Sequence, residues 1–186
     1  ILEVIPSEKD FFALSEKDLQ HITNSKSKII SQSYRNEKVE LAKKEIEFII
    51  KNNIATTYFT DADYPSRMLN ASDAPILLFS LGKCNLNAKH IISIVGTRHA
   101  SHYGKSFVDS FVEDITQSLD DVVIVSGLAY GIDILAHKAC IDKNAPTAAV
   151  LAHGLNTIYP TSHRSYAAEI VHCNGSLITE YTSQTH

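Results

Sequence analysis

Two glycine-containing loops hold residue types that suit a phosphate ligand. The first loop contains Gly96, Thr97 and Arg98 and joins an apolar run to a helical segment. Free N–H groups at the start of a helix attract anions, and an arginine guanidinium donates to a phosphate through two parallel hydrogen bonds. The second loop runs from Ser126 to Gly131, and its two glycines and Ala129 would let the backbone approach a ligand closely. Neither loop is a G-x-G-x-x-G or a Walker sequence, so the pattern does not support dinucleotide or nucleoside triphosphate chemistry.

The second loop leads into residues that have competing interpretations. Tyr130 could stack a nucleobase, or it could cover an apolar surface of its own domain. Asp133 lies in the first turn of the following helix, where its charge suits the helix dipole, and we interpret it as structural. His137 follows one helical turn later and could pair with Asp133.

A third loop, from Ala152 to Arg164, is long for a strand-to-helix connection, and such loops often carry function. His163 and Arg164 open the next helix, where a positive charge is mildly unfavourable to the helix dipole. A phosphate bound there would offset this cost. A fourth loop follows Thr179 and carries Glu180 and Tyr181.

The sequence holds no pattern for metal or nucleophilic chemistry. It has nine histidines but no His-Glu-x-x-His segment, and neither the pair His99 and His102 nor the pair His153 and His163 is joined by an obvious carboxylate ligand. Ser126 is not part of a G-x-S-x-G elbow. We therefore expect no catalytic residue, no metal and no cofactor.

The apolar pattern predicts elements that would bring these loops to one edge of a sheet. Residues 55–59 look like a strand, and 76–79 is another short apolar run. Further strand candidates at 91–95, 122–125, 147–151 and 176–179 alternate with helix candidates at 101–119, 131–142 and 163–173. These strand candidates are continuous apolar runs, as expected for a sheet that is covered on both faces. The alternation predicts an α/β fold with an open, mostly parallel sheet, in which ligands bind at the carboxyl ends of the strands.

The first part of the chain has a different pattern. Residues 8–22 and 37–52 predict two helices, with a polar turn at 24–28 between them. The charged residues of the second helix fall opposite its apolar residues, which is more typical of a solvated surface than of a partner site. We therefore divide the chain into a small N-terminal helical region, 1–52, and an α/β domain, 53–186.

Composition restricts where a nucleic acid could bind. The formal net charge is −4 and the pI is about 6.1, so a nucleic-acid site has to be focal rather than a diffuse basic coat. No apolar run is long enough to cross a bilayer, and the start of the chain does not resemble a secretory signal. The three cysteines form no C-x-x-C pair, which favours reduced thiols in a cytosolic protein over a disulfide.

Five segments match one family in order and spacing. They are Pro75-x-x-Leu78-Phe79-x-x-Gly82, Ile94-Val95-Gly96-Thr97-Arg98-x-Ala100-Ser101-x-Tyr103-Gly104, Val125-Ser126-Gly127-Leu128-Ala129-x-Gly131-Ile132-Asp133-x-x-Ala136-His137, Ala149-Val150-Leu151-x-x-Gly154-Leu155-x-x-x-Tyr159-Pro160 and Leu177-Ile178-x-Glu180-Tyr181. Over residues 60–181 the chain therefore resembles the DNA processing protein A family, DprA/Smf. The helical region, 1–52, resembles part of the family's small N-terminal, SAM-like domain.

The resemblance implies an extended Rossmann-like domain that binds single-stranded DNA in the cytoplasm. It implies protection of incoming DNA during natural transformation and help in loading a RecA-type recombinase. Family members form homodimers and are not known as enzymes. Arg98 corresponds to the family's DNA-contacting arginine, the segment 126–131 to its glycine-rich DNA-binding loop, and Arg164 to a basic residue that often follows the Tyr-Pro motif. The residues expected to contact DNA are Gly96, Thr97, Arg98, Ser126, Gly127, Ala129, Tyr130, Gly131 and Arg164.

Two positions depart from the family pattern. Tyr130 stands where other members carry a basic residue, so stacking would replace a charge there, and Thr182 stands where a proline is usual. The resemblance also places His186 before the family's Arg-Asn-Arg segment and any winged-helix domain. We therefore expect the α/β domain to be incomplete at its C-terminus, which leaves open whether this chain self-associates.

Two other functions stay open at this stage. The related nucleoside monophosphate phosphoribohydrolases bind nucleotides in the same crevice, but their Pro-Gly-Gly-x-Gly-Thr loop is absent here. A protein-interaction module without a ligand is the other alternative. The clustering of glycine, arginine and hydroxyl residues at strand ends argues against it.

Overall fold

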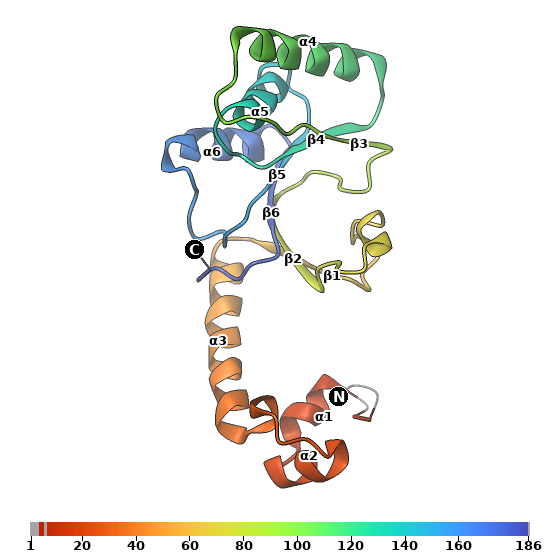
Figure 1. Ribbon diagram of the computed structural model, residues 1–186, viewed down its shortest axis with the longest axis vertical. Coiled ribbons are helices and arrows are strands. Elements are labelled where there is room, and N and C mark those ends of the chain that lie inside the picture. The colour runs from red at the N-terminus through yellow and green to blue at the C-terminus, as the bar shows by residue number, and fades with distance from the viewer. Residues whose placement is uncertain (1–3, 6, 186) are drawn as a thin grey trace. The chain divides into compact units, whose positions relative to one another are not determined.

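The computed structural model describes residues 4, 5 and 7–185 of the chain (Figure 1). It divides into two compact units, residues 1–50 and 51–186. The outer limits of the two predicted regions, at residue 1 and at His186, lie outside the described residues. Each unit has its own apolar core.

The first unit is helical, with α1 (Glu8–Ala13), α2 (Glu16–Thr23), a 3₁₀ turn η1 (Lys28–Ile30) and α3 (Gln32–Lys51). The predicted single helix over 8–22 is wrong, because Leu14 has an extended backbone between α1 and α2. The tetrapeptide Ser-Glu-Lys-Asp occurs at 7–10 and again at 15–18, and in both copies the serine side chain accepts a hydrogen bond from the aspartate N–H. Each copy therefore caps a new helix. The second predicted helix is confirmed, but it begins at Gln32 rather than at 37.

Arg35 is buried in the first unit and serves as a C-terminal cap for α1. Its Nη1 donates to the carbonyl oxygens of Phe11 and Leu14 at 2.7 and 2.9 Å, and its Nη2 donates to Gln32 at 2.8 Å. Carbonyl groups at a helix C-terminus lack intrahelical donors and carry partial negative charge, so a guanidinium is a favourable partner. Beside it, Ile5, Leu19 and Ile30 form the apolar core.

The second unit contains a six-stranded sheet with the order β1-β2-β6-β5-β4-β3. The strands are β1 (Ala55–Tyr58), β2 (Leu77–Gly82), β3 (His90–Ser93), β4 (Val122–Ser126), β5 (Thr147–Val150) and β6 (Ser176–Thr179). Strands β3 to β6 pair in parallel, whereas β1 and β2 form an antiparallel edge against β6. The predicted α/β fold with a mostly parallel sheet is confirmed.

Helices α4 (His102–Ser118), α5 (Ile132–Asp142) and α6 (Arg164–His172) lie together against one face of this sheet (Figure 1). Alternate residues of β4 show how both faces are buried, because Val122 and Ile124 belong to the apolar cluster with residues of α4 and α5, while Val123 belongs to a separate cluster that contains Tyr64. That other face is covered by irregular segments and the 3₁₀ turn η2 (Met68–Asn70) rather than by long helices. Burial on both faces explains why the strands are continuous apolar runs.

Two further expectations from composition can be compared with the structure. None of the described helices is long and apolar enough to span a membrane. The three cysteines are free. Burial raises the pKa of the Cys84 thiol to about 11 and that of Cys140 to about 12, so both thiols stay protonated near neutral pH.

Candidate nucleic-acid interface

The carboxyl ends of β3, β4 and β5 lie at one edge of the sheet because these strands are parallel. The loops that follow them surround a pocket of about 230 Å³. The pocket is therefore lined by residues that are far apart in the sequence. Its lining residues are Arg98, Gly127, Ala129, Tyr130, Leu151, Ala152, His153, Tyr159 and Pro160. Four of the predicted site residues are in this set.

Arg98 supplies the formal charge of this pocket. Its side chain is exposed, and it forms no hydrogen bond or ion pair with any other described residue. Among the described residues that line the pocket there is no carboxylate. A guanidinium that has no internal partner and faces no acid is free to donate to an anion, and its geometry suits a phosphate.

The loop between β3 and α4 is held by its own side chains. Thr97 Oγ1 accepts a hydrogen bond from the N–H of His99, and the Ser101 hydroxyl accepts one from the N–H of Gly104, both at 3.1 Å. Two of the N–H groups that could have donated to a phosphate therefore already donate to side chains of the same loop. The predicted phosphate cradle at this helix start is smaller than the sequence indicated, and Arg98 is left as its main donor.

Gly131 joins the first two loops. Its φ is +81°, a conformation that residues with side chains rarely adopt, and a β-carbon there would overlap the backbone of Thr97 and Arg98. The N–H of Ile132 donates to the Thr97 carbonyl oxygen at 3.1 Å. Gly96 also packs closely against the start of α5, because a β-carbon on Gly96 would lie 2.7 Å from Ile132 Cγ1. These glycines let two loops pack against each other, whereas the sequence interpretation was that glycine let the backbone approach a ligand.

Tyr130 stands at the rim of the pocket with 48% of its surface exposed. Its ring packs edge-on against His163, with centroids 4.9 Å apart, and its hydroxyl oxygen lies 3.1 Å from that of Ser162. His163 is buried, and its Nδ1 donates to the Leu128 carbonyl oxygen at 2.8 Å, because a carbonyl can only accept. His163 therefore supports the second loop from inside the fold, a role that the sequence did not indicate.

Ser126 and Asp133 make their contacts inside the fold. Ser126 is buried, and its hydroxyl donates to the carbonyl oxygen of Ile94 at 2.6 Å, which joins β4 to the end of β3. The Oδ2 atom of Asp133 accepts a hydrogen bond from the N–H of Gly127 at 3.2 Å. Both side chains shape the second loop from within, and the structural interpretation of Asp133 agrees with this geometry.

His137 does not form the expected pair with Asp133 among the described contacts. Its Nδ1 lies 2.8 Å from the Thr147 hydroxyl, and that hydroxyl donates to the Ile124 carbonyl oxygen at 2.8 Å. The Thr147 proton is thus already used, so His137 Nδ1–H is the donor. Its Nε2 is buried with no hydrogen-bond partner in the described part of the chain. Burial, and then the proximity of His163, lower the pKa of His137 to about 4.

His153 and Tyr159 are pocket residues that sequence reasoning missed. The Nδ1 of His153 donates to the Gly154 carbonyl oxygen at 3.0 Å, and its Nε2 accepts from the N–H of Tyr159 at 3.3 Å. Both ring nitrogens are therefore used to shape the third loop. This leaves the Tyr159 side chain 69% exposed beside the pocket. The length of the loop was the available signal, but it did not single out these two residues.

Arg164 and the fourth loop lie beyond this group. Arg164 is the exposed first residue of α6 and is not among the described residues that line the pocket. The fourth loop packs on the third, because the N–H of Gly154 donates to the Thr185 carbonyl oxygen at 2.9 Å. Within the described residues, no group of three or more histidine, cysteine or acidic side chains could hold a metal ion.

Comparison with known proteins identifies the family. The family model for DNA recombination-mediator protein A matches residues 55–186, most of the chain. The chain belongs to this family. Protein Smf from Escherichia coli is 39% identical over 118 residues, a match that covers 63% of this chain and 31% of that protein. The chain thus spans about a third of the length of this relative.

Two solved structures are similar to the chain. DNA processing protein A (DprA) from Streptococcus pneumoniae superposes with a TM-score of 0.71 and 25% identity, covering 93% of this chain and 58% of the solved chain. DNA processing protein A from Helicobacter pylori superposes with a TM-score of 0.60 and 26% identity, covering 72% of this chain and 58% of the solved chain. These similarities confirm the family resemblance and the Rossmann-like α/β fold.

Proposed function

We propose that the second unit binds single-stranded DNA at the pocket formed by the first three strand-to-helix loops. The observation that carries this proposal is Arg98, a guanidinium without an internal partner in a pocket that two exposed tyrosines, Tyr130 and Tyr159, also line. The related Helicobacter pylori protein has a described single-stranded DNA binding mode. Membership of the same family supports the same ligand here.

In this proposal each part of the site has a separate task. Arg98 donates to a phosphate, and the backbone of the first two loops, which includes Gly96, Thr97, Gly127, Ala129 and Gly131, supplies the surface against which the strand lies. Tyr130 and Tyr159 offer ring faces on which bases stack. Ser126 acts through the position of β4, and Arg164 contacts the strand outside the pocket. Few side chains are available to read base edges, so sequence preference is weak.

The cellular part of the proposal follows from the family. The whole protein protects incoming DNA in the cytoplasm during natural transformation and helps to load a RecA-type recombinase, and it acts as a homodimer. It binds DNA without a cofactor and without catalysis.

A titration with single-stranded and blunt duplex DNA of one sequence, at about 50 and 200 mM salt, tests the binding proposal. We expect tighter binding to the single strand at both salt concentrations, with a modest salt dependence because few cations contact phosphates. Equal or tighter binding to the duplex would contradict the proposal. A nucleoside monophosphate hydrolysis assay on the same preparation tests the enzyme alternative, and turnover would refute the non-catalytic part.

A further inference from the structure

Helix α4 carries an exposed row of aromatic rings that the pocket does not use. Tyr103, Phe107 and Phe111 follow one another at intervals of four residues, so they lie along one side of the helix. Tyr103 is 78% exposed and Phe107 is 56% exposed, while Phe111 is partly buried. The ring centroids are 6.3 Å apart for the first pair and 5.9 Å for the second, with interplanar angles of 30° and 13°.

We propose that Tyr103 and Phe107 extend the single-stranded DNA path from the pocket along α4. This inference rests on the proposed function, because it needs a strand that begins at Arg98. α4 starts directly after the loop that holds Arg98, so the row begins at the pocket end of the helix. From Tyr103 to Phe111 the helix rises by about 12 Å away from the pocket.

The ring spacing suits a strand of bases. Successive stacked bases rise by about 3.4 Å, so spacings near 6 Å place one ring at roughly every second nucleotide. Every base has a flat face that an aromatic ring can stack on, so such a row binds without reading sequence. This agrees with the weak sequence preference proposed for the pocket.

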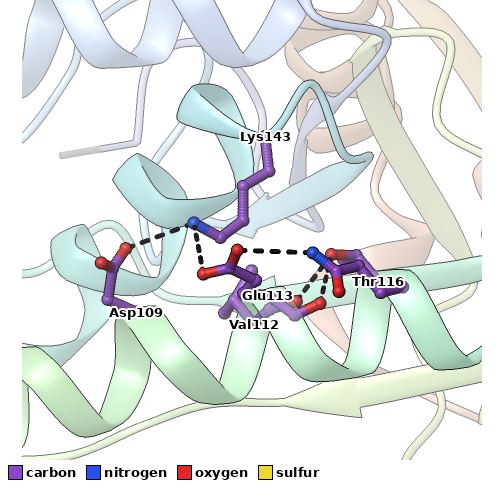
Figure 2. A network of polar contacts seen from close by, with 6 residues as sticks. Asp109, Val112, Glu113, Thr116 and Lys143 are labelled. Atoms are coloured by element: carbon purple, nitrogen blue, oxygen red, sulfur yellow. Dashed lines mark hydrogen bonds and ion pairs between the residues drawn. The ribbon is translucent and has the colours of Figure 1, made fainter.

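Two of the three acids of α4, Asp109 and Glu113, lie away from the row. Lys143, just after α5, lies between Asp109 and Glu113, with its Nζ 3.6 Å from a carboxylate oxygen of each (Figure 2). Asp109 and Glu113 are themselves one turn apart, on a different flank of the helix from the rings. Phosphates that follow Tyr103 and Phe107 would therefore meet little repulsion. Asp114 is exposed about one helical turn after Phe111, and its negative charge marks the end of the favourable path.

The width of the row favours a nucleic-acid strand over a second copy of this chain. The row is one ring wide, and its polar neighbours Ser106 and Ser110 are exposed. A stable protein interface buries about 800 Å² on each partner and has an apolar centre. A single file of rings with serines beside it is a poor centre for such an interface, but it matches a platform for successive bases.

Oligo(dT) of two lengths tests this inference on the full chain. An oligomer of about 4 nucleotides is expected to occupy the pocket alone, and one of about 12 to reach α4 as well. We expect the double variant Tyr103→Ala/Phe107→Ala to lose at least about fivefold in affinity for the longer oligomer, the lower end of stacking effects, and to bind the shorter one like the parent chain. Tyr103→Phe/Phe107→Tyr should keep both affinities, whereas Tyr103→Leu/Phe107→Leu should lose the longer one.

A tryptophan reporter gives a second measurement that does not depend on loss of binding. The chain contains no tryptophan, so Phe107→Trp introduces a single one at the row. Its fluorescence should be quenched by the longer oligomer and not by the shorter one. Phe59→Trp is the matched control, because Phe59 is an exposed aromatic residue just after β1, at the opposite edge of the sheet from β3.

The outcomes separate this inference from the proposed function. If the parent chain binds neither oligomer, the proposed function fails and the inference fails with it. If the parent chain binds both and the double alanine variant, folded by its melting curve, binds both equally well, the inference alone is overturned. A variant that changes the sedimentation of the free protein but not its affinity would show that the row is an interface between copies, which also overturns the inference.

Discussion

The Nδ1 atom of His163 lies 2.8 Å from the carbonyl oxygen of Leu128, and this hydrogen bond joins the start of α6 to the loop after β4. Leu128 has a φ of +60° and is fully buried. A leucine in this left-handed conformation costs on the order of 1–3 kcal/mol and persists only when its surroundings hold it. His163 supplies part of that support, and its ring also packs against Tyr130.

Replacing His163 separates its two contributions. His163→Asn keeps a side-chain N–H near the position of Nδ1 but removes the ring, whereas His163→Ala removes both. We expect the alanine variant to lose about 1–3 kcal/mol in the free energy of unfolding, since a buried carbonyl is left without its donor, and the asparagine variant to lose less. Urea denaturation of the two variants checks this order. Equal losses would mean that the hydrogen bond contributes little.

Arg98→Ala is expected to weaken single-stranded DNA binding by about 1.5–3 kcal/mol, the contribution of a charge-assisted hydrogen bond. The loss should shrink as salt rises. Arg164→Ala should cost less than Arg98→Ala, because Arg164 is exposed outside the pocket. Single Lys→Ala variants in residues 1–52 should also cost less than Arg98→Ala. A lysine variant with an equal loss would move the site to the helical region. Fluorescence anisotropy, after a melting curve for each variant, provides the measurement.

Tyr130→Ala should cost roughly 1–3 kcal/mol of affinity if the ring stacks a base, and this loss should be nearly independent of salt. Tyr130→Phe should lose little affinity, because stacking needs the ring, although it removes the hydroxyl contact with Ser162. If the ring only covers His163, the alanine variant will melt at a lower temperature while its folded fraction binds normally. Affinity and melting temperature measured on one preparation decide between these roles.

Gly131→Ala should destabilise the second unit strongly. The new methyl group would overlap the Thr97 carbonyl, and alanine at a φ of +81° is strained. Gly104→Ala is the matched control. Gly104 lies in helix α4, and a β-carbon there would make an ordinary contact of 3.4 Å with the side chain of Ile132. That variant should gain about 0.5–1 kcal/mol from higher helix propensity. Thermal melts of the two variants should therefore move in opposite directions.

The lowered pKa of His137 predicts that the folded chain loses stability in mild acid. Its pKa is lowered from 6.5 to about 4 in the folded chain, mainly by burial. Between these two values the unfolded chain binds a proton that the folded chain does not, so the free energy of unfolding falls as the pH falls from 6.5 to about 4. The full effect is about 3 kcal/mol. Below about pH 4 this group adds no further loss.

His137→Gln removes this titration and should flatten the decline. The comparison is made between urea denaturation curves of the parent chain and the variant at several pH values from 7 to 4.5. The two proteins differ only at residue 137, so the difference between the two curves isolates His137. Parallel curves would contradict the prediction.

The sequence by itself determined the α/β class, the mostly parallel sheet and the alternation of strands with helices along the chain. The order of the strands within the sheet was not predicted. Continuous apolar runs, strand-to-helix glycines and helix periodicity are local signals, and Arg98 could be singled out because it lies two residues after Gly96 at a strand end. The same local signals were misread at Leu14, where a second serine cap divided a helix that the apolar spacing joined.

Only the tertiary structure decided what the individual residues of the site do. Gly131 packs against Thr97, His163 supports Leu128, and Tyr159 reaches the pocket because His153 holds its backbone. The first two contacts join residues that are distant in the sequence, so no local pattern predicts them. The apolar runs of the strands likewise do not show what covers each face of the sheet, because hydrophobic burial is non-directional. Only the tertiary structure determined that helices cover one face and irregular segments cover the other.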